Sequence, residues 1–356
     1  MTSETVVVKV GTSSVTTAEG SVDATILDAI ARDVASLGAT DRTVVVVTSG
    51  AITAGWTAVG AGRQRPSDAV TLQAVAAVGQ PLLMDAWRNS FARHGLSVGQ
   101  VLLAPHDFAH RGQYLHARAT IAALVELGVV PIVNENDAVA DEEIRYGDND
   151  RLAALVANLV AADLLVLLTD TPGLLTADPR LDPEATLIEE VVAIDRELEA
   201  IAGASRSGVG SGGMASKLGA ARLATWSGVE TVIASAREPA VLERVVAREA
   251  GVGTRFVARR DRLSARKAWI AFAVPTVATL TINDGAVDAL VRDGRSLLRV
   301  GVTGHSGPFD SGDALELLDV RGELVAKGLS RMSSDARDDG EVVAVHRDDM
   351  VVLKKP

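Results

Sequence analysis

The sequence predicts an α/β protein in which a mainly parallel sheet lies between helices and is followed by a small β-barrel-like domain. Strand and helix patterns alternate from residue 5 to about residue 250, and the strands are apolar throughout. A parallel sheet that is covered on both faces has such strands, because both of their faces are buried. Beyond residue 253 come short strand-like pieces separated by Asp-Gly and Gly-rich turns, a pattern typical of a small barrel.

The elements of the first domain follow from two periodicities. Short runs rich in Val, Ile and Leu predict strands at residues 6–10, 43–48, 97–103, 129–133, 164–169 and 230–234. Apolar residues at helical spacing predict helices at residues 26–37, 68–92, 115–127, 151–161, 192–202, 214–226 and 238–249. Ligands of such sheets bind beyond the carboxyl ends of the strands, so we expect the functional site there.

Composition separates three segments of the chain. We expect a catalytic domain over residues 1–253, a basic linker over 254–274 and a small β domain over 275–356. The linker is expected because its basic residues share the segment with a single acid, Asp261. In the last segment 14 acids outnumber 10 Lys and Arg, which argues against phosphate contacts by that domain.

Bulk properties exclude several classes of protein. The formal net charge of −11 makes non-specific nucleic-acid binding unfavourable. The chain has no cysteine, which excludes disulfides and thiolate metal sites, and its histidines lack zinc-ligand spacing. No apolar stretch approaches the roughly 20 residues that span a bilayer, and no signal peptide is recognisable. We therefore expect a cytoplasmic protein without a membrane segment.

The lysines are few and unevenly placed. Only six of the 35 basic residues are lysines, and Lys9 and Lys217 are the only two within the first 266 residues. Lys9 interrupts the apolar strand VVVKV, just before a Gly-Thr-Ser-Ser turn that begins at Gly11. A lysine is a compact point charge on a flexible stem, whereas arginine is a planar fork. The distribution indicates two positions at which the guanidinium group of arginine would not fit.

Polar or glycine-rich segments follow the predicted strands or precede the predicted helices. In TSGAI, Ser49 can donate a hydrogen bond, while Gly50 and Ala51 let a ligand approach the backbone. The segment GVGSGGMASK places a glycine-rich turn before a helix that contains Lys217, which suits a phosphate group, although it is not a P-loop.

Carboxylates and amides are concentrated in two neighbouring segments. NENDAV and GDND contribute Asn134, Asp137, Asp148, Asn149 and Asp150. Helix capping explains one of these residues, but not the group as a whole. The set could bind an α-ammonium group, hold Mg²⁺ through water or orient lysine side chains, and the sequence does not choose among these roles.

Taken together, these motifs resemble the glutamate 5-kinases, which are amino-acid kinases with a C-terminal PUA domain. The resemblance runs from about residue 5 to residue 352. It rests on the segments VKVGTS, VVVTSGAI, LQAVAAVGQ, GVVPIVNENDAV, GDND, LLTDTPGLLTADPR, GVGSGGMASK and AVHRDDMV. Two segments depart from the family pattern: HARATI at 116–121, and a shortened stretch before AVHRDDM that indicates a trimmed PUA domain.

The resemblance implies a reaction and a set of residues. The reaction is ATP-dependent phosphorylation of the side-chain carboxylate of L-glutamate, the first step toward proline. Lys9 and Lys217 would act at the transferred phosphoryl group, with Asp150 organising both. The remaining implied residues are Ser49, Asn134, Asp137 and Asn149 for glutamate, and Thr169, Asp170, Ser211, Gly212, Gly213, Met214, Ala215, Ser216 and Lys217 for the nucleotide.

Elementary chemistry agrees with this reaction. A γ-carboxylate has a pKa of about 4.3, so it is ionised at neutral pH and needs no general base. Catalysis must then come from positioning and from positive charge, supplied by lysines, backbone N–H groups and Mg²⁺ on the ATP phosphates. Feedback inhibition by proline and a homodimer or homotetramer are further expectations from the resemblance.

Other readings remain open from the sequence. Kinases of N-acetylglutamate, aspartate, carbamate or a nucleoside monophosphate share the implied fold. The opening VKVGTS, rather than KFGGTS, disfavours aspartokinase, and the C-terminal barrel disfavours acetylglutamate kinase. An RNA-binding protein is the alternative from another class, with the basic segment at 255–267 as its candidate surface.

Overall fold

A computed structural model describes residues 4–17, 19–60, 65–104, 107–108, 110–139, 149–179, 181–204, 213–260, 262–272, 274, 276–335 and 343–354. The chain divides into two units, Met1–Arg262 and Leu263–Pro356. The segment 254–274, expected to be a linker, contributes the short strand β8 (Thr254–Phe256) to the first unit and the helix α11 (Ala265–Phe272) to the second. The division therefore falls inside that segment.

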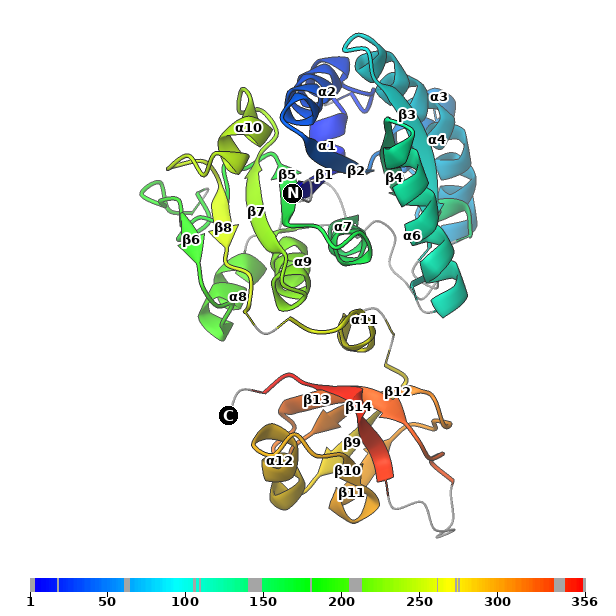
Figure 1. Cartoon of the computed structure of the whole chain (residues 1–356), viewed down its shortest axis with the longest axis vertical. Helices are drawn as coiled ribbons and strands as arrows, with labels where there is room; N and C mark the ends of the chain where they lie inside the picture. The colour runs from blue at the N-terminus through cyan, green and yellow to red at the C-terminus, as the bar shows by residue number, and fades with distance from the viewer. Residues whose placement is uncertain are drawn as a thin grey trace. The chain divides into compact units, whose positions relative to one another are not determined.

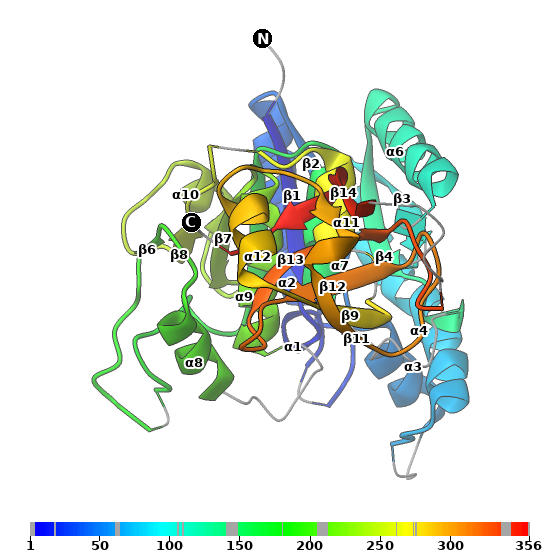
Figure 2. The same ribbon diagram turned by 90° about the horizontal axis from the view of Figure 1, so that it is seen from below.

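The first unit contains a mostly parallel sheet of eight strands, which confirms the predicted fold class. Their order is β3-β4-β2-β1-β5-β7-β8-β6, with β3 and β6 at the edges (Figures 1 and 2). All pairs are parallel except β7 with β8. The strands other than β8 are β1 (Glu4–Val10), β2 (Arg42–Thr48), β3 (Ser97–Leu103), β4 (Val129–Glu135), β5 (Leu164–Thr169), β6 (Glu190–Val191) and β7 (Glu230–Ser235).

Helices cover both faces of this sheet. Figure 1 shows α2 and α10 on one face and α7 and α9 on the other. The predicted helical patterns all correspond to helices, whereas α1 and α3 fall where the sequence predicted no helix. Helix α3 begins immediately after Gly50 of the TSGAI motif. The helices are α1 (Thr12–Val15), α2 (Ala24–Ala39), α3 (Ala51–Val59), α4 (Ala69–Ala92), α6 (Arg111–Glu126), α7 (Asn149–Leu159), α8 (Arg196–Ala204), α9 (Met214–Trp226) and α10 (Val241–Val246).

Helices α3 and α4 cross so closely that their backbones are in contact. A Cβ atom built on Gly79 would lie 1.8 Å from the carbonyl oxygen of Ala51, and one on Gly55 would lie 2.0 Å from that of Val75. No side chain fits at either position, so glycine at both sites allows the two helices to meet. This contact brings the middle of α4 close to the end of strand β2, from which α3 starts.

Helix α4 corrects one expectation from the sequence. Among the described residues it is the one helix that is long and apolar enough to cross a membrane by length and composition. Its Leu83, Trp87 and Phe91 are fully buried in the core of the first unit, beside residues of α2. A helix that contributes to a hydrophobic core passes the same test of composition as a membrane span.

The second unit is a six-stranded, mostly antiparallel sheet with a small apolar core. The strand order is β10-β14-β13-β12-β9-β11. Asn283 caps helix α12 (Asp284–Val291) by accepting a bond from the backbone N–H of Ala286, so the Asp-Gly pair expected to form a turn begins a helix instead. The strands are β9 (Ala278–Ile282), β10 (Leu297–Leu298), β11 (Val302–Ser306), β12 (Ala314–Leu318), β13 (Leu324–Ser330) and β14 (Val343–Val352).

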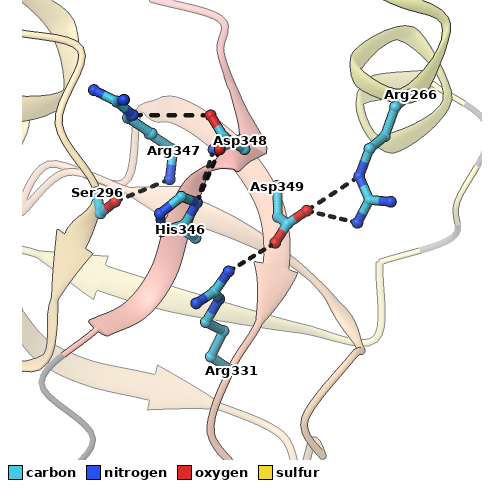
Figure 3. A network of polar contacts seen from close by, with 7 residues as sticks. All are labelled: Arg266, Ser296, Arg331, His346, Arg347, Asp348 and Asp349. Atoms are coloured by element: carbon cyan, nitrogen blue, oxygen red, sulfur yellow. Dashed lines mark hydrogen bonds and ion pairs between the residues drawn. The ribbon is translucent and has the colours of Figure 1, made fainter.

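Within the second unit, a carboxylate joins helix α11 to strand β14. Asp349 of β14 accepts hydrogen bonds from Nε and Nη2 of Arg266 at 3.1 and 2.6 Å, and from Arg331 at 3.4 Å (Figure 3). Arg266 belongs to the basic segment, and its charge is therefore engaged inside this unit. Helix α11 also packs against β14 and β13, and its Ala268 and Ile270 are buried.

Candidate active site

Two lysines that are distant in the sequence meet at one carboxylate. Nζ of Lys9 lies 2.5 Å from Oδ1 of Asp150, and Nζ of Lys217 lies 3.2 Å from Oδ2 of the same residue. Asp150 is fully buried, while Lys9 and Lys217 are 5% and 6% exposed. The hydroxyl of Ser216 also donates to Oδ2 at 3.3 Å. The interrupted apolar strand thus holds a charge that is paired, as a buried charge must be.

Three secondary-structure elements position this cluster. Lys9 is the next-to-last residue of β1, which lies in the interior of the sheet between β2 and β5. Asp150 is in the first turn of α7, and Lys217 is in the first turn of α9, which packs against α7. The carboxyl end of the strand and the amino ends of the two helices therefore converge.

The electrostatics of the cluster favour an anion. Burial raises the pKa of Asp150, but the two ammonium groups outweigh it and hold the pKa below its usual value. The carboxylate is thus ionised, and it brings two ammonium groups to one place. Ammonium groups in a buried place are suited to a phosphoryl group, because little water is present to screen their charge.

Asn149 immediately precedes Asp150 and forms hydrogen bonds with the last residue of β2 and the residue after it. Its Nδ2 donates to the carbonyl oxygen of Thr48 and to Oγ of Ser49, both at 2.9 Å. Nδ2 also lies 3.0 Å from Oδ1 of Asn134, at the end of β4, so its two hydrogens are shared among three acceptors. Asn149 is 4% exposed, and its Oδ1 has no hydrogen-bond partner among the described residues. A buried acceptor in this condition is available to a donor on a ligand.

Two glycines lie next to these side chains. Gly50 has φ of +107°, and a Cβ there would come within 2.7 Å of Val15, so glycine is required between Ser49 and Ala51. A Cβ on Gly11 would lie 3.5 Å from Nζ of Lys9, which means that a longer side chain would fill the space beside the ammonium group. Gly11 therefore lies beside the ammonium group, while Gly50 is required by its backbone conformation and its contact with Val15.

Asp137 lines a separate part of the same sheet edge. It belongs to the 3₁₀ turn Asp137–Val139 and borders a pocket of about 280 Å³ together with Ala51, Gln80 and Gln100. Burial raises its pKa to about 6. The two glutamines were not predicted from the sequence. Gln80 ends the segment LQAVAAVGQ, where it is a polar residue within an apolar helix, and this interruption is the signal that could have identified it.

The remaining predicted residues divide into three groups. Thr169 ends β5 and donates to Oδ1 of Asp170 at 3.1 Å, and the backbone N–H of Gly11 donates to the carbonyl of Leu168 just before them. Gly213 caps α9 without a side-chain bond, so the helix starts with backbone donors in the run Met214, Ala215 and Ser216. Three predicted residues lie outside the described part of the chain: Asp148, Ser211 and Gly212.

Comparison with known proteins shows which family these features belong to. The amino acid kinase family matches residues 4–235, and the PUA domain matches residues 278–347. The glutamate 5-kinase of Paraburkholderia phymatum is 44% identical over 367 residues, covering 99% of this chain and 98% of that protein. That of Shewanella amazonensis is 47% identical over 366 residues, covering 98% and 96%. The chain belongs to the amino acid kinase family, among the glutamate 5-kinases. The resemblance drawn from the sequence is confirmed.

Solved structures of other kinases share the fold. An isopentenyl phosphate kinase superposes with a TM-score of 0.51 at 18% identity, covering 71% of this chain and all of that one. Carbamate kinase from Giardia lamblia bound to AMP-PNP gives 0.50 at 16% identity, covering 72% and 98%. At these identities the likeness concerns the fold of the first unit, and it does not extend to the substrate.

Proposed function

We propose that this protein transfers the γ-phosphoryl group of ATP to the side-chain carboxylate of L-glutamate and forms L-glutamyl 5-phosphate. The observation that carries the proposal is the convergence of Lys9 and Lys217 on the buried Asp150. Both substrates are anionic at the reacting atoms, so their approach requires positive charge. Relatives at 44–47% identity over nearly the whole chain carry the name of this enzyme.

The chemistry requires no proton transfer by the protein. A γ-carboxylate oxygen attacks the γ-phosphorus of ATP, a new O–P bond forms, and the bond to the β–γ bridging oxygen breaks to release ADP. The attacking group is already ionised at neutral pH. We assign Lys9 and Lys217 to the negative charge on the transferred phosphoryl oxygens, and Asp150 to holding the two ammonium groups in place.

We extend the proposal to the substrate and nucleotide sites. We assign Ser49, Asn149 and Asp137 to glutamate, because they combine a hydroxyl, a buried amide oxygen without a partner among the described residues, and a carboxylate that can hold an ammonium group. We assign the backbone donors at the start of α9 to the ATP phosphates, with Thr169 and Asp170 at the adjacent strand end.

The donor set suits Mg²⁺ that arrives with the nucleotide. No group of three or more His, Asp or Glu able to hold a metal ion occurs among the residues that the structure describes. We therefore propose that Mg²⁺ is bound mainly by ATP phosphates and water, which is common for this ion. When bound, it would supply further positive charge at the phosphates.

We also propose that the protein forms a homo-oligomer through α4 and the edge strand β3. Val70, Val78 and Leu82 lie along one side of α4 and are 68%, 41% and 43% exposed. The helix contacts β3, whose outer edge is unpaired in the sheet order. A second copy of the chain would cover both features. Light scattering should give a mass of at least two chains, and inhibition by proline, which stays a prediction, can be titrated on the same sample.

The alternative of RNA binding is weakened by contacts of the basic segment. Arg255 pairs with Glu230, the guanidinium of Arg259 lies 4.1 Å above the ring of Trp226, and Arg266 binds Asp349. These cations are engaged within their own units. We therefore assign the segment a structural role. RNA binding at physiological salt by a preparation without kinase activity would reverse this assignment.

Trapping of the product with hydroxylamine tests the proposed function. An acyl phosphate reacts with hydroxylamine to give a hydroxamate that forms a coloured iron complex. We expect hydroxamate that depends on ATP, Mg²⁺ and L-glutamate, and none with aspartate or N-acetylglutamate. Carbamate and UMP, assayed through ADP release, should also be inactive. A preference for any of these four over L-glutamate would contradict the proposal.

A further inference from the structure

Four side-chain amides form a continuous chain of hydrogen bonds that ends at the candidate active site. Nε2 of Gln80 in α4 donates to Oε1 of Gln100 in β3 at 3.0 Å. Nδ2 of Asn134 in β4 donates to Oε1 of Gln80 at 2.7 Å, and Nδ2 of Asn149 in α7 donates to Oδ1 of Asn134 at 3.0 Å. Elements that are separate in the sequence are thereby joined through one polar path.

Backbone groups fix the direction of this chain of amides. The carbonyl oxygen of Thr48 can only accept, so Asn149 must present its Nδ2 to β2. The backbone N–H of Glu135 can only donate, and it donates to Oδ1 of Asn134 at 2.9 Å, which leaves Nδ2 of Asn134 to find an acceptor. Oε1 of Gln80 is that acceptor. Asn134 is 1% exposed, so water cannot readily replace Oε1 of Gln80 as the acceptor for its Nδ2.

We propose that Gln80 is a positioning residue for glutamate binding. It holds the amide of Asn134, and Asn134 holds the amide of Asn149, whose buried Oδ1 has no hydrogen-bond partner among the residues that the structure describes. This inference rests on the proposed function, because it assumes that Oδ1 of Asn149 accepts a hydrogen bond from the substrate. Gln80 also borders the pocket of Asp137, on the side of Ala51.

The helix crossing explains how Gln80 reaches this position. It follows Gly79, whose missing side chain lets α4 meet the backbone of α3 at Ala51. The neighbouring residues of α4 are apolar: Ala76, Ala77, Val78, Pro81 and Leu82. Both ends of the Gln80 amide are bonded to other elements: Nε2 to an exposed residue of β3, and Oε1 to the buried Asn134 of β4.

Two substitutions of Gln80 test the role of its acceptor oxygen separately from the packing of its side chain. Gln80→Met keeps the length and removes both hydrogen-bonding atoms, so Nδ2 of Asn134 is left buried without an acceptor. We expect KM for glutamate to rise about tenfold, as one lost hydrogen bond would produce, with kcat and KM for ATP within about twofold of wild type. Gln80→Glu restores an acceptor for Asn134, and its KM for glutamate should return to within about threefold of wild type.

The control is Gln113→Met on α6, where the glutamine is exposed to solvent. It should leave all three kinetic constants unchanged. The proposal is overturned if Gln80→Met leaves KM for glutamate within twofold of wild type, if it raises KM for ATP by the same factor, or if Gln80→Glu is no better than Gln80→Met. In the last case the side chain serves packing, and the acceptor oxygen is irrelevant.

A readout that does not depend on turnover distinguishes this proposal from the proposed function. If wild type forms no hydroxamate from glutamate, the assigned reaction is wrong, whereas the amide chain can still be examined in crystals of wild type and Gln80→Met. We expect the amides of Asn134 and Asn149 to reorient or shift in the variant. Unchanged amides at both residues, with all partners kept, would refute the positioning role of Gln80.

Discussion

Each unit of the protein contains an aspartate held between two cations, and the two arrangements differ in burial and in the kind of cation. In the first unit Asp150 is fully buried, and the side chains of Lys9 and Lys217 are 6% and 7% exposed. In the second unit Asp349 is 18% exposed, and its partners Arg266 and Arg331 are 60% and 41% exposed. Burial raises the pKa of both carboxyl groups, and their cations lower it further than burial raises it.

The difference teaches what each cluster can do. An arginine fork at the surface binds a carboxylate in a fixed plane and is screened by water, so the pair joins two elements and adds little free energy. A buried ammonium group keeps donors that can turn toward a second anion, and its field is screened far less. The same pattern of charges is therefore a structural contact at Asp349 and a candidate catalytic centre at Asp150.

The largest effects should come from removing either lysine. We expect Lys9→Ala and Lys217→Ala each to lower kcat at least about 100-fold, because each removes a charge from the developing transition state. Hydroxamate assays at saturating glutamate and ATP measure this directly. Circular dichroism of each variant shows whether it is folded. A folded alanine variant with near-normal turnover would remove that lysine from the mechanism.

The next effect concerns the carboxylate between the lysines. Asp150→Asn removes the buried negative charge that both ammonium groups contact, so we expect the free energy of unfolding to fall by about 3 kcal/mol. Turnover should fall as well, since the ammonium groups lose the anchor that sets their positions. The matched change Asp349→Asn in the second unit should leave both kcat and KM of the kinase reaction unchanged. Chemical denaturation and steady-state kinetics of both variants test the contrast.

A moderate effect is expected from pH at Asp137. Its pKa of about 6 means that the carboxylate gains a proton as the pH falls through 6, and it then loses the charge that would hold the α-ammonium group of glutamate. The value of kcat/KM for glutamate should therefore fall below pH 6 and level off above it. Asp137→Asn should lower the plateau by roughly 10- to 100-fold and abolish this acid limb. An unchanged acid limb in the variant would assign the titration to another group.

The smallest effect should come from the surface pair. Arg266→Ala removes an exposed partner of Asp349, and we expect less than about 1 kcal/mol of lost stability, further reduced at high salt. The kinetic constants should stay at wild-type values. Thermal unfolding at two salt concentrations measures the change. A loss of activity in this variant would mean that the second unit takes part in catalysis.

Much of the first unit could be predicted from its sequence. Each long strand contains a run that is mostly apolar, so its position is a local property of the sequence, and the order of strands and helices along the chain follows. The convergence of Lys9 and Lys217 was inferred from the rarity of lysine and from the resemblance. The two lysines meet only because α7 packs against α9, and this packing cannot be predicted from the spacing of residues in the sequence.

The elements that escaped prediction depend on distant contacts or on short local signals. Strands β6 and β8 are two and three residues long, too short to show a period. Helix α12 begins at an Asp-Gly pair, which in sequence is typical of a turn, and the side chain of Asn283 caps the helix there. The role inferred for Gln80 exists only because β3, β4 and α7 bring three other amides to it.

An exchange of cation types in the two clusters tests the central distinction most directly. Lys217→Arg and Arg266→Lys both keep the charge and change only the shape of the group. We predict that kcat of Lys217→Arg falls at least about 100-fold while Arg266→Lys retains wild-type turnover, because only the buried centre requires a point charge. Wild-type turnover in a folded Lys217→Arg variant would contradict the account.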